Sequence, residues 1–193
     1  WFGNDNSTLL WHFPLPDRYS RRNPHASPPG ARQVLPGDGD VGRVFPASRT
    51  LARFNDPQAA NRLTSACGPE LYRDDLLGPS LTGNAFVCEP VHNLVRRAVL
   101  ESDGPSYRTH RAPQESASEF LSSTDNWFRP VEVRTGPDGA LWVVDMHRFV
   151  VEHPQWISAE RLAELDVRAG EGTGRIWRVL PAGTKARPIR NLT

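Results

Sequence analysis

The chain has 193 residues, enough for one domain with a hydrophobic core, although only 38% of them are hydrophobic. Its 18 prolines and 15 glycines indicate short strands joined by irregular loops and argue against a helix bundle. Lys185 is the only lysine, and arginines and acids balance to a formal net charge of +1, so the composition gives no case for binding nucleic acid. No apolar run approaches the roughly 20 residues of a transmembrane segment.

The N-terminal part, residues 1–47, is predicted to hold one short strand and a long loop. Residues 8–13 form the strand, after a turn over residues 3–6. Residues 14–46 are rich in proline, glycine and arginine and lack hydrophobic periodicity, which predicts a surface loop. We therefore expect residues 1–47 to be the remnant of a β-unit followed by this loop.

Three strands are predicted in the next part of the chain, over residues 63–68, 84–90 and 93–101. The third is ambiguous, because its apolar residues would also form one face of a helix. Residues 103–116 are predicted to be a loop.

A hairpin is predicted within residues 127–148. Apolar and polar residues alternate over residues 131–135, residues 137–139 supply a reversal, and residues 140–145 form an almost uninterrupted apolar run. The second strand is therefore expected to lie deeper in the sheet, with Asp145 at its inner end.

An internal repeat favours strands throughout this region. Residues 83–97 align with residues 139–148, continued after an insertion by residues 174–181. Each copy has a glycine and an apolar run that closes on a carboxylate, Glu89 or Asp145, before a strand with an apolar pair and an arginine. A unit used twice in this way favours a β-turn-β-β structure.

The insertion, residues 149–173, is expected to contain a short helix over residues 158–168 with Ser158 as its N-cap. An insertion of this length between two strands commonly builds a site or an interface. The tail, residues 182–193, is predicted to be a linker.

Repeated antiparallel units of about 40 to 60 residues are typical of β-propeller blades. We expect an all-β fold, a partial β-propeller with long loops and one short inserted helix. Its two antiparallel blades are expected over residues 63–118 and 119–181, within a propeller region of residues 48–181 that follows the N-terminal remnant. Because a propeller closes with roughly four to eight blades, the chain is expected to be a piece of a larger propeller.

The only cysteines are Cys67 and Cys88. A disulfide between them is the favoured interpretation, and two buried free thiols are the alternative. Closing a loop of about 20 residues would stabilise the fold by roughly 3 kcal/mol and would indicate an oxidising compartment.

Several motifs carry a family resemblance over about residues 48–181: TSACGPELYRDDLLGP, GNAFVCEPVHNLVRR, FLSSTDNWFRPVEVRTGPDGALWVVDMHR, EHPQWI and GRIWRVLP. In this order they resemble the C-terminal part of the propeller in membrane-bound dehydrogenases of planctomycete and verrucomicrobial type. Those large secreted proteins resemble glucose/sorbosone dehydrogenases, and many carry a haem-binding CxxCH cytochrome module further on. His147 departs from the pattern, because an aromatic residue is expected after the DM pair.

The resemblance implies an extracytoplasmic sugar or alcohol dehydrogenase that passes electrons to a cytochrome c-type domain or protein. It implies pyrroloquinoline quinone and calcium as cofactors, with haem confined to a downstream module that this chain does not include. The alternative is a non-catalytic propeller module that binds glycans or another protein domain.

The inner strands of a propeller end at its central channel, so Glu89 and Asp145 are candidate calcium ligands. His147 and His92 are candidate general bases for removing a hydroxyl proton. A purely structural role is the alternative for all four residues. The carboxylates would then cap strands, and the histidines would be ordinary hydrogen-bonded loop residues.

Two arginines, Arg129 and Arg148, flank the hairpin and are candidate clamps for a quinone carboxylate. The alternative is that they pair with nearby acids such as Asp125. The tryptophans of this region, Trp127 among them, are expected to pack the blades rather than to form a sugar platform.

Overall fold

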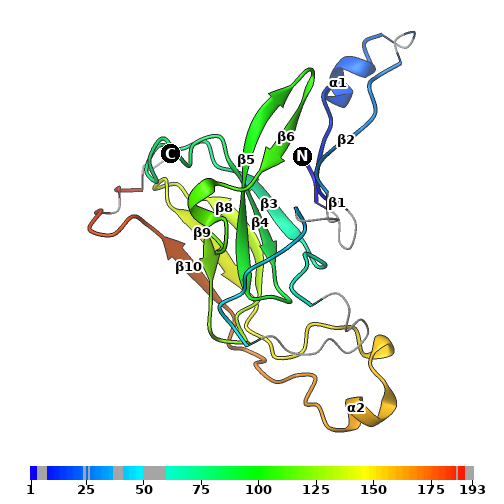
Figure 1. Cartoon of the computed structure of the whole chain (residues 1–193), viewed down its shortest axis with the longest axis vertical. Helices are drawn as coiled ribbons and strands as arrows, with labels where there is room; N and C mark the ends of the chain where they lie inside the picture. Colours follow the sequence, from blue (N-terminus) through cyan, green and yellow to red (C-terminus); the bar gives the residue numbers. More distant parts are fainter. Residues whose placement is uncertain are drawn as a thin grey trace.

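The computed structural model describes residues 1–3, 8–23, 25, 27–36, 41–49, 60–185 and 187–189. These residues form an all-β structure whose sheets curl into a partial propeller, with a few short helical segments (Figure 1). The strands are β1 (Thr8–His12), β2 (Arg32–Pro36), β3 (Cys67–Leu71), β4 (Ala85–Glu89), β5 (Leu94–Asp103), β6 (Ser106–His110), β7 (Leu121–Ser122), β8 (Pro130–Thr135), β9 (Leu141–Asp145) and β10 (Arg175–Val179). The helices are α1 (Asp17–Ser20) and α2 (Ala159–Ala163), with 3₁₀ turns η2 (Pro113–Glu115) and η3 (Pro154–Trp156).

The predicted repeat is present with the same register in both copies. In the first sheet β4 lies between β3 and β5, and in the second β9 lies between β8 and β10, all antiparallel. The cross-strand pair of Glu89 with Leu94 in the first sheet is equivalent to the pair of Asp145 with Arg175 in the second. The ambiguous segment 93–101 is therefore a strand, as the repeat predicted.

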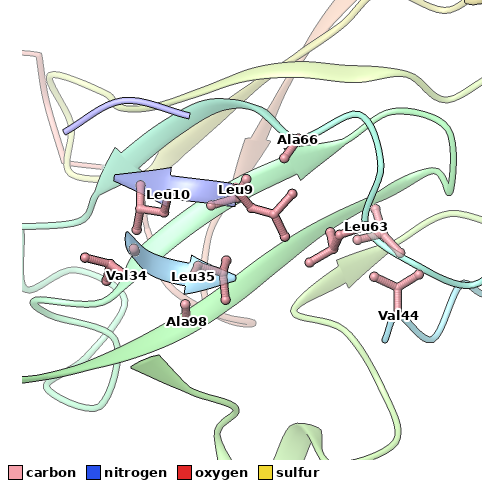
Figure 2. Packing of buried hydrophobic residues seen from close by; sticks show 11 residues of the cluster. Leu9, Leu10, Val34, Leu35, Val44, Leu63, Ala66 and Ala98 are labelled. Atoms are coloured by element: carbon pink, nitrogen blue, oxygen red, sulfur yellow. The ribbon is translucent and has the colours of Figure 1, made fainter. Parts of the chain in front are cut away.

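The first sheet is packed on both of its faces. Strand β4 is buried along its whole length, since Ala85 and Val87 contribute to one core cluster while Phe86 and Cys88 contribute to the other. The first cluster joins this sheet to the β1–β2 hairpin, whose leucines lie over it in Figure 2. The second cluster joins it to β8 and β9. This alternation is what a strand between two layers requires.

The expectation for the second hairpin holds only in part. Strand β9 is central, but its side chains alternate between buried and half-buried because no described layer covers its outer face. Its neighbour β10 is mostly exposed, and Ile176 and Trp177 are 62% and 45% exposed.

Several boundaries differ from the sequence-based expectations. The loop predicted over residues 14–46 contains α1 and β2, and the one over residues 103–116 contains β6. The strand expected over residues 63–68 begins later, at Cys67. In the insertion, Ser158 caps the helix as predicted, accepting the Arg161 backbone N–H at 3.4 Å, but α2 is shorter than expected.

Part of the predicted linker lies outside the described residues, at 186 and 190–193. Within the described part, Arg187 forms ion pairs with Asp74 and Asp75, which precede β4.

Candidate functional site

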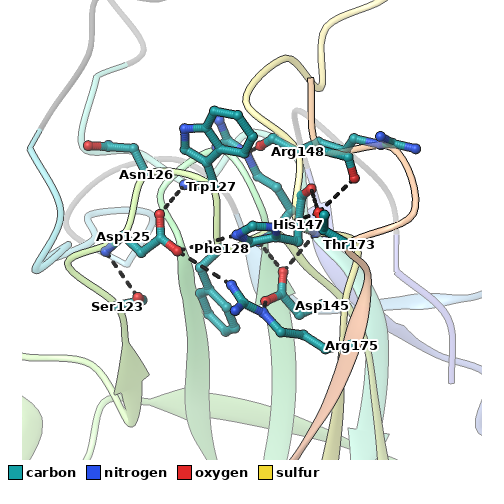
Figure 3. Close-up of polar contacts among 12 residues, drawn as sticks. Ser123, Asp125, Asn126, Trp127, Phe128, Asp145, His147, Arg148, Thr173 and Arg175 are labelled. Atoms are coloured by element: carbon teal, nitrogen blue, oxygen red, sulfur yellow. Dashed lines mark hydrogen bonds and ion pairs between the residues drawn. The ribbon is translucent and has the colours of Figure 1, made fainter. Parts of the chain in front are cut away.

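Asp145, the last residue of β9, is the centre of a hydrogen-bonded cluster (Figure 3). Its Oδ1 accepts the backbone N–H groups of Arg129 at 2.8 Å and His147 at 2.9 Å. Its Oδ2 accepts Arg175 Nε and Trp177 Nε1, each at 3.0 Å. Burial alone would raise the pKa of the Asp145 carboxyl, but these four hydrogen bonds lower it below its ordinary value. Asp145 therefore joins β9 to the start of β8, to its own following loop and to β10.

Glu89 occupies the equivalent position in the first sheet and is fully buried. It accepts the backbone N–H groups of Thr64 and Ser65, both at 3.1 Å, and the Ser65 hydroxyl at 2.7 Å. His92 Nδ1 lies 3.1 Å from it, and the Asn61 backbone N–H donates to His92 Nε2 at 3.0 Å. Since Nε2 accepts, Nδ1 carries the proton and donates to Glu89. Both ring nitrogens of His92 are thus engaged.

The predicted metal ligands do not fit calcium as arranged. Each oxygen of Glu89 and Asp145 already accepts two hydrogen bonds. Calcium takes about six to eight oxygen ligands, and within the described ranges no three histidine, cysteine or acidic side chains are placed to hold a metal ion. Their role as metal ligands remains a prediction.

Arg129 is buried and bound to carbonyl oxygens. Its Nε donates to Arg148 at 2.8 Å, its Nη1 to Pro90 at 2.8 Å and Val91 at 3.2 Å, and its Nη2 to Phe149 at 2.6 Å. Burial lowers the pKa of this guanidinium to about 10. Arg129 therefore fastens the loop after β4 to the loop after β9, and most of its donors are occupied.

Arg148, the other predicted clamp, is half-buried. Its Nη1 donates to the carbonyl of Arg168 in the insertion at 3.1 Å. A role for either arginine in holding a quinone stays a prediction.

His147 lies at the accessible edge of this cluster and has a left-handed backbone conformation, φ 50°. Its Nδ1 is 2.6 Å from the Thr173 hydroxyl, which also lies 2.7 Å from the Gly170 carbonyl. Because that hydroxyl donates to Gly170, His147 Nδ1 donates to Thr173. Nε2 is then the nitrogen left to accept a proton or a ligand, and it lies 3.5 Å from Asp125 Oδ2.

An aromatic ring adjoins this histidine. The half-buried Trp127 ring lies 5.6 Å from the His147 ring and 6.0 Å from the Phe149 ring. Arg175 Nη2 lies 3.4 Å from the exposed Asp125 carboxylate, and Figure 3 shows it on the opposite side of His147 from the Trp127 ring. We call Asp125, Trp127, His147, Thr173 and Arg175 the Trp127 surface. It combines the face of one aromatic ring with side chains that donate hydrogen bonds and side chains that accept them.

Sequence reasoning found only part of this surface. The sequence predicts His147 as a base, Asp125 only as a partner for an arginine, and Trp127 as a packing residue rather than a sugar platform. Thr173 was missed because it lies in an insertion without periodicity. The repeat could have drawn attention to Arg175. It is the cross-strand partner of Asp145, in the position that Leu94 takes opposite Glu89.

The expected disulfide is absent from the structure, and this corrects the favoured interpretation of the cysteines. Cys67 and Cys88 are opposite each other in the β3–β4 ladder, but both are free thiols. The register is irregular after Cys67, and its sulfur lies 3.9 Å from the Pro130 carbonyl on β8. Free thiols also remove the cysteine-based argument for an oxidising compartment.

The fold and the cluster together define an all-β, propeller-like protein with a partly exposed His–Asp–Trp surface beside the end of a central strand, β9. The chain matches the model of a family described as a domain of unknown function (DUF7133) over residues 1–183, and it belongs to that family. No curated protein and no solved structure matches it. In the part of the chain that the structure describes, no helix has the length and apolarity to cross a bilayer.

Proposed function

We propose that this chain is a non-catalytic propeller module that binds glycans at the Trp127 surface. The observation that carries the proposal is the half-buried Trp127 ring beside His147 Nε2 and the exposed Asp125 carboxylate. Sugars present an apolar face of C–H groups and a rim of hydroxyls. An aromatic ring packs against the apolar face of a sugar, while imidazole, carboxylate and guanidinium groups form hydrogen bonds with its hydroxyls.

The state of the buried carboxylates supports binding rather than catalysis. Glu89 and Asp145 use their oxygens to hold backbone and side-chain donors, and Arg129 uses its donors to hold carbonyls. Asp145 and Arg129 in this way hold the backbone of His147 and Phe149 next to Trp127, which favours a preorganised binding surface.

Glycan titration with matched variants tests the proposal. The chain is titrated calorimetrically with a panel of neutral and acidic oligosaccharides. Trp127→Ala should weaken binding about tenfold or more, since a buried aromatic contact contributes roughly 1–3 kcal/mol. Trp156→Ala, which removes a 60% exposed tryptophan from η3, should leave affinity unchanged. Equal effects of the two variants, or no binding by the wild-type chain, would count against it.

A second candidate, a quinoprotein sugar or alcohol dehydrogenase, is favoured by the His147–Asp125 pair. His147 Nε2 is placed to accept a hydroxyl proton, and Asp125 would stabilise the imidazolium that forms. Pyrroloquinoline quinone would supply the oxidising equivalents, and this chain's Glu89 and Asp145 do not fit the accompanying calcium as arranged. This candidate includes an extracytoplasmic location and a cytochrome c-type electron acceptor, both of which rest on the family resemblance.

Activity of the intact protein separates the candidates. The full-length protein is given the quinone, calcium, a sugar and an artificial electron acceptor. Reduction of the acceptor that is lost in His147→Asn would establish the dehydrogenase. Asparagine suits this test because it tolerates the positive φ of residue 147 and removes the imidazole. Glycan binding without reduction would establish the binding module.

A further inference from the structure

A separate cavity of about 450 Å³ lies between residues 41–45, strand β5 and the connection from β6 to η2. It shares no lining residue with the Trp127 surface. Three arginines from different segments converge on it: Arg43, Arg96 and Arg111. We call it the arginine cavity.

Arg96, on β5, is the most deeply buried of the three, with 2% of its surface exposed. Its Nη1 donates to the Arg43 carbonyl at 2.9 Å, while its Nε has no hydrogen-bond partner among the residues that the structure describes. Burial and the nearby Arg111 lower the pKa of Arg96 to about 10. A buried guanidinium with an unused donor is costly unless an acceptor reaches it.

The other two arginines are held around one aromatic ring. The guanidinium carbons of Arg43 and Arg111 lie 5.1 Å and 4.9 Å from the centre of the Phe45 ring. Arg111 Nη2 also donates to the Arg43 carbonyl at 2.7 Å and to Glu119, and its Nη1 donates to the Glu115 and Ser118 carbonyls, so Arg111 offers the cavity its charge rather than its Nη donors. These contacts orient both cations at low entropic cost, which is the preorganisation that an anion site needs.

The acids nearby do not neutralise this group. Glu119 pairs with Arg111 at 3.1 Å and lines a neighbouring cavity, and Glu115 pairs with Arg97 at 3.1 Å. Both glutamates also act on Arg96 electrostatically. Among the residues that the structure describes, the three arginines of the cavity and Arg97 still outnumber these two carboxylates, which leaves an excess of positive charge beside a hollow large enough for a small ligand.

We propose that the arginine cavity binds an oxyanion group, either the carboxylate of an acidic sugar or a sulfate or phosphate group. The exposed guanidinium of Arg43 presents parallel N–H donors that match all of these groups, and Arg96 and Arg111 add positive charge. The site is independent of the glycan-binding proposal and would stand if that proposal failed.

Anion titration at constant ionic strength tests the site. Sulfate, inorganic phosphate and glucuronate are titrated against the chain, with chloride as the reference. The expected result is saturable binding by at least one of the three, accompanied by movement of the Arg96 Nε–H resonance in nuclear magnetic resonance spectra. Binding by glucuronate alone would identify a sugar carboxylate, and binding by sulfate or phosphate alone would identify a tetrahedral group.

Two variants with the same change in charge provide the control. Arg43→Ala removes an exposed guanidinium but keeps the carbonyl that Arg96 and Arg111 bind, so the fold is retained. It should weaken anion binding about tenfold, the effect of losing one charge-assisted hydrogen bond. Arg108→Ala, on the exposed side of β6, should leave it unchanged.

Three results would overturn the proposal. They are a response to chloride equal to that of the oxyanions, equal weakening by Arg43→Ala and Arg108→Ala, and loss of anion binding in Trp127→Ala. The last result would move the anion site to the Trp127 surface.

Discussion

Arg129 and Asp145 are joined by a hydrogen bond from the Arg129 backbone N–H to Asp145 Oδ1 at 2.8 Å, and the Arg129 guanidinium reaches the Pro90 carbonyl directly after β4. One residue thus connects the inner ends of both repeated strands. Both carboxylates of the repeat accept backbone and side-chain hydrogen bonds, Arg129 joins the loops that follow them, and His147 lies next to Asp145 at the partly exposed edge.

Replacing Arg129 by lysine should destabilise the protein by about 2–4 kcal/mol. An ammonium group cannot serve carbonyls on two loops with a planar fork, so buried acceptors lose their donor. The free energy of unfolding in urea measures the effect. Arg161→Lys on exposed α2 is the control and should change stability by less than about 0.5 kcal/mol. Similar values for the two variants would contradict the role assigned to Arg129.

Stability should fall in acid because of Asp145. Its pKa is lowered in the folded state, so its contribution is fully present above the unfolded value of about 4 and is lost as pH falls through the folded value. Asp145→Asn should therefore flatten the dependence of unfolding free energy on pH below about pH 4. Asp138, whose pKa is also lowered, remains in the variant and keeps part of the slope. An unchanged slope would contradict the hydrogen-bonding account of Asp145.

Both thiols should be unreactive in the native protein. Burial, with a smaller contribution from Glu89 and Glu132, raises the pKa of Cys67 to about 12, and burial raises that of Cys88 well above its ordinary value. A thiol-specific reagent at pH 8 should label neither quickly, and should label two thiols after unfolding without reductant. Failure to label the unfolded protein would establish the disulfide that the sequence favoured.

Gly68 and Gly104 form a matched pair for separating backbone strain from close packing. Both have positive φ, 51° and 56°. A Cβ on Gly68 would lie 2.5 Å from Glu132 Cα, whereas a Cβ on Gly104 would meet none of the described residues within 4 Å. Gly104→Ala should cost about 1 kcal/mol, and Gly68→Ala should cost at least about 2 kcal/mol more. If both variants lost the same unfolding free energy in thermal unfolding, β3 and β8 would be less closely packed than the structure shows.

The sequence predicted the repeated strands because each carries a long apolar run that must be buried, and it placed Glu89 and Asp145 at equivalent ends. It did not predict β2 or β6, because each is a short segment without a long apolar run: β2 has two buried apolar residues, Val34 and Leu35, and β6 is mostly polar. Their strand structure depends on pairing with β1 and β5, a long-range condition that local periodicity does not report.

The candidate site was likewise predictable from the sequence only in part. His147 could be selected because it stands beside a strand-ending carboxylate. Its neighbours Asp125 and Thr173 are 22 and 26 positions away and are brought to it by loop geometry. The free state of the cysteines likewise depends on the direction of the Cys67 side chain, which its spacing from Cys88 does not determine.

The most direct test of glycan binding follows individual side chains during a glycan titration by nuclear magnetic resonance. If the Trp127 surface binds glycans, the Trp127 indole N–H and the His147 imidazole resonances should move together with one saturation curve. The Trp156 indole N–H on η3 should stay in place. Movement of Trp156 without Trp127, or no saturable shift at Trp127 and His147 with any glycan, would contradict it.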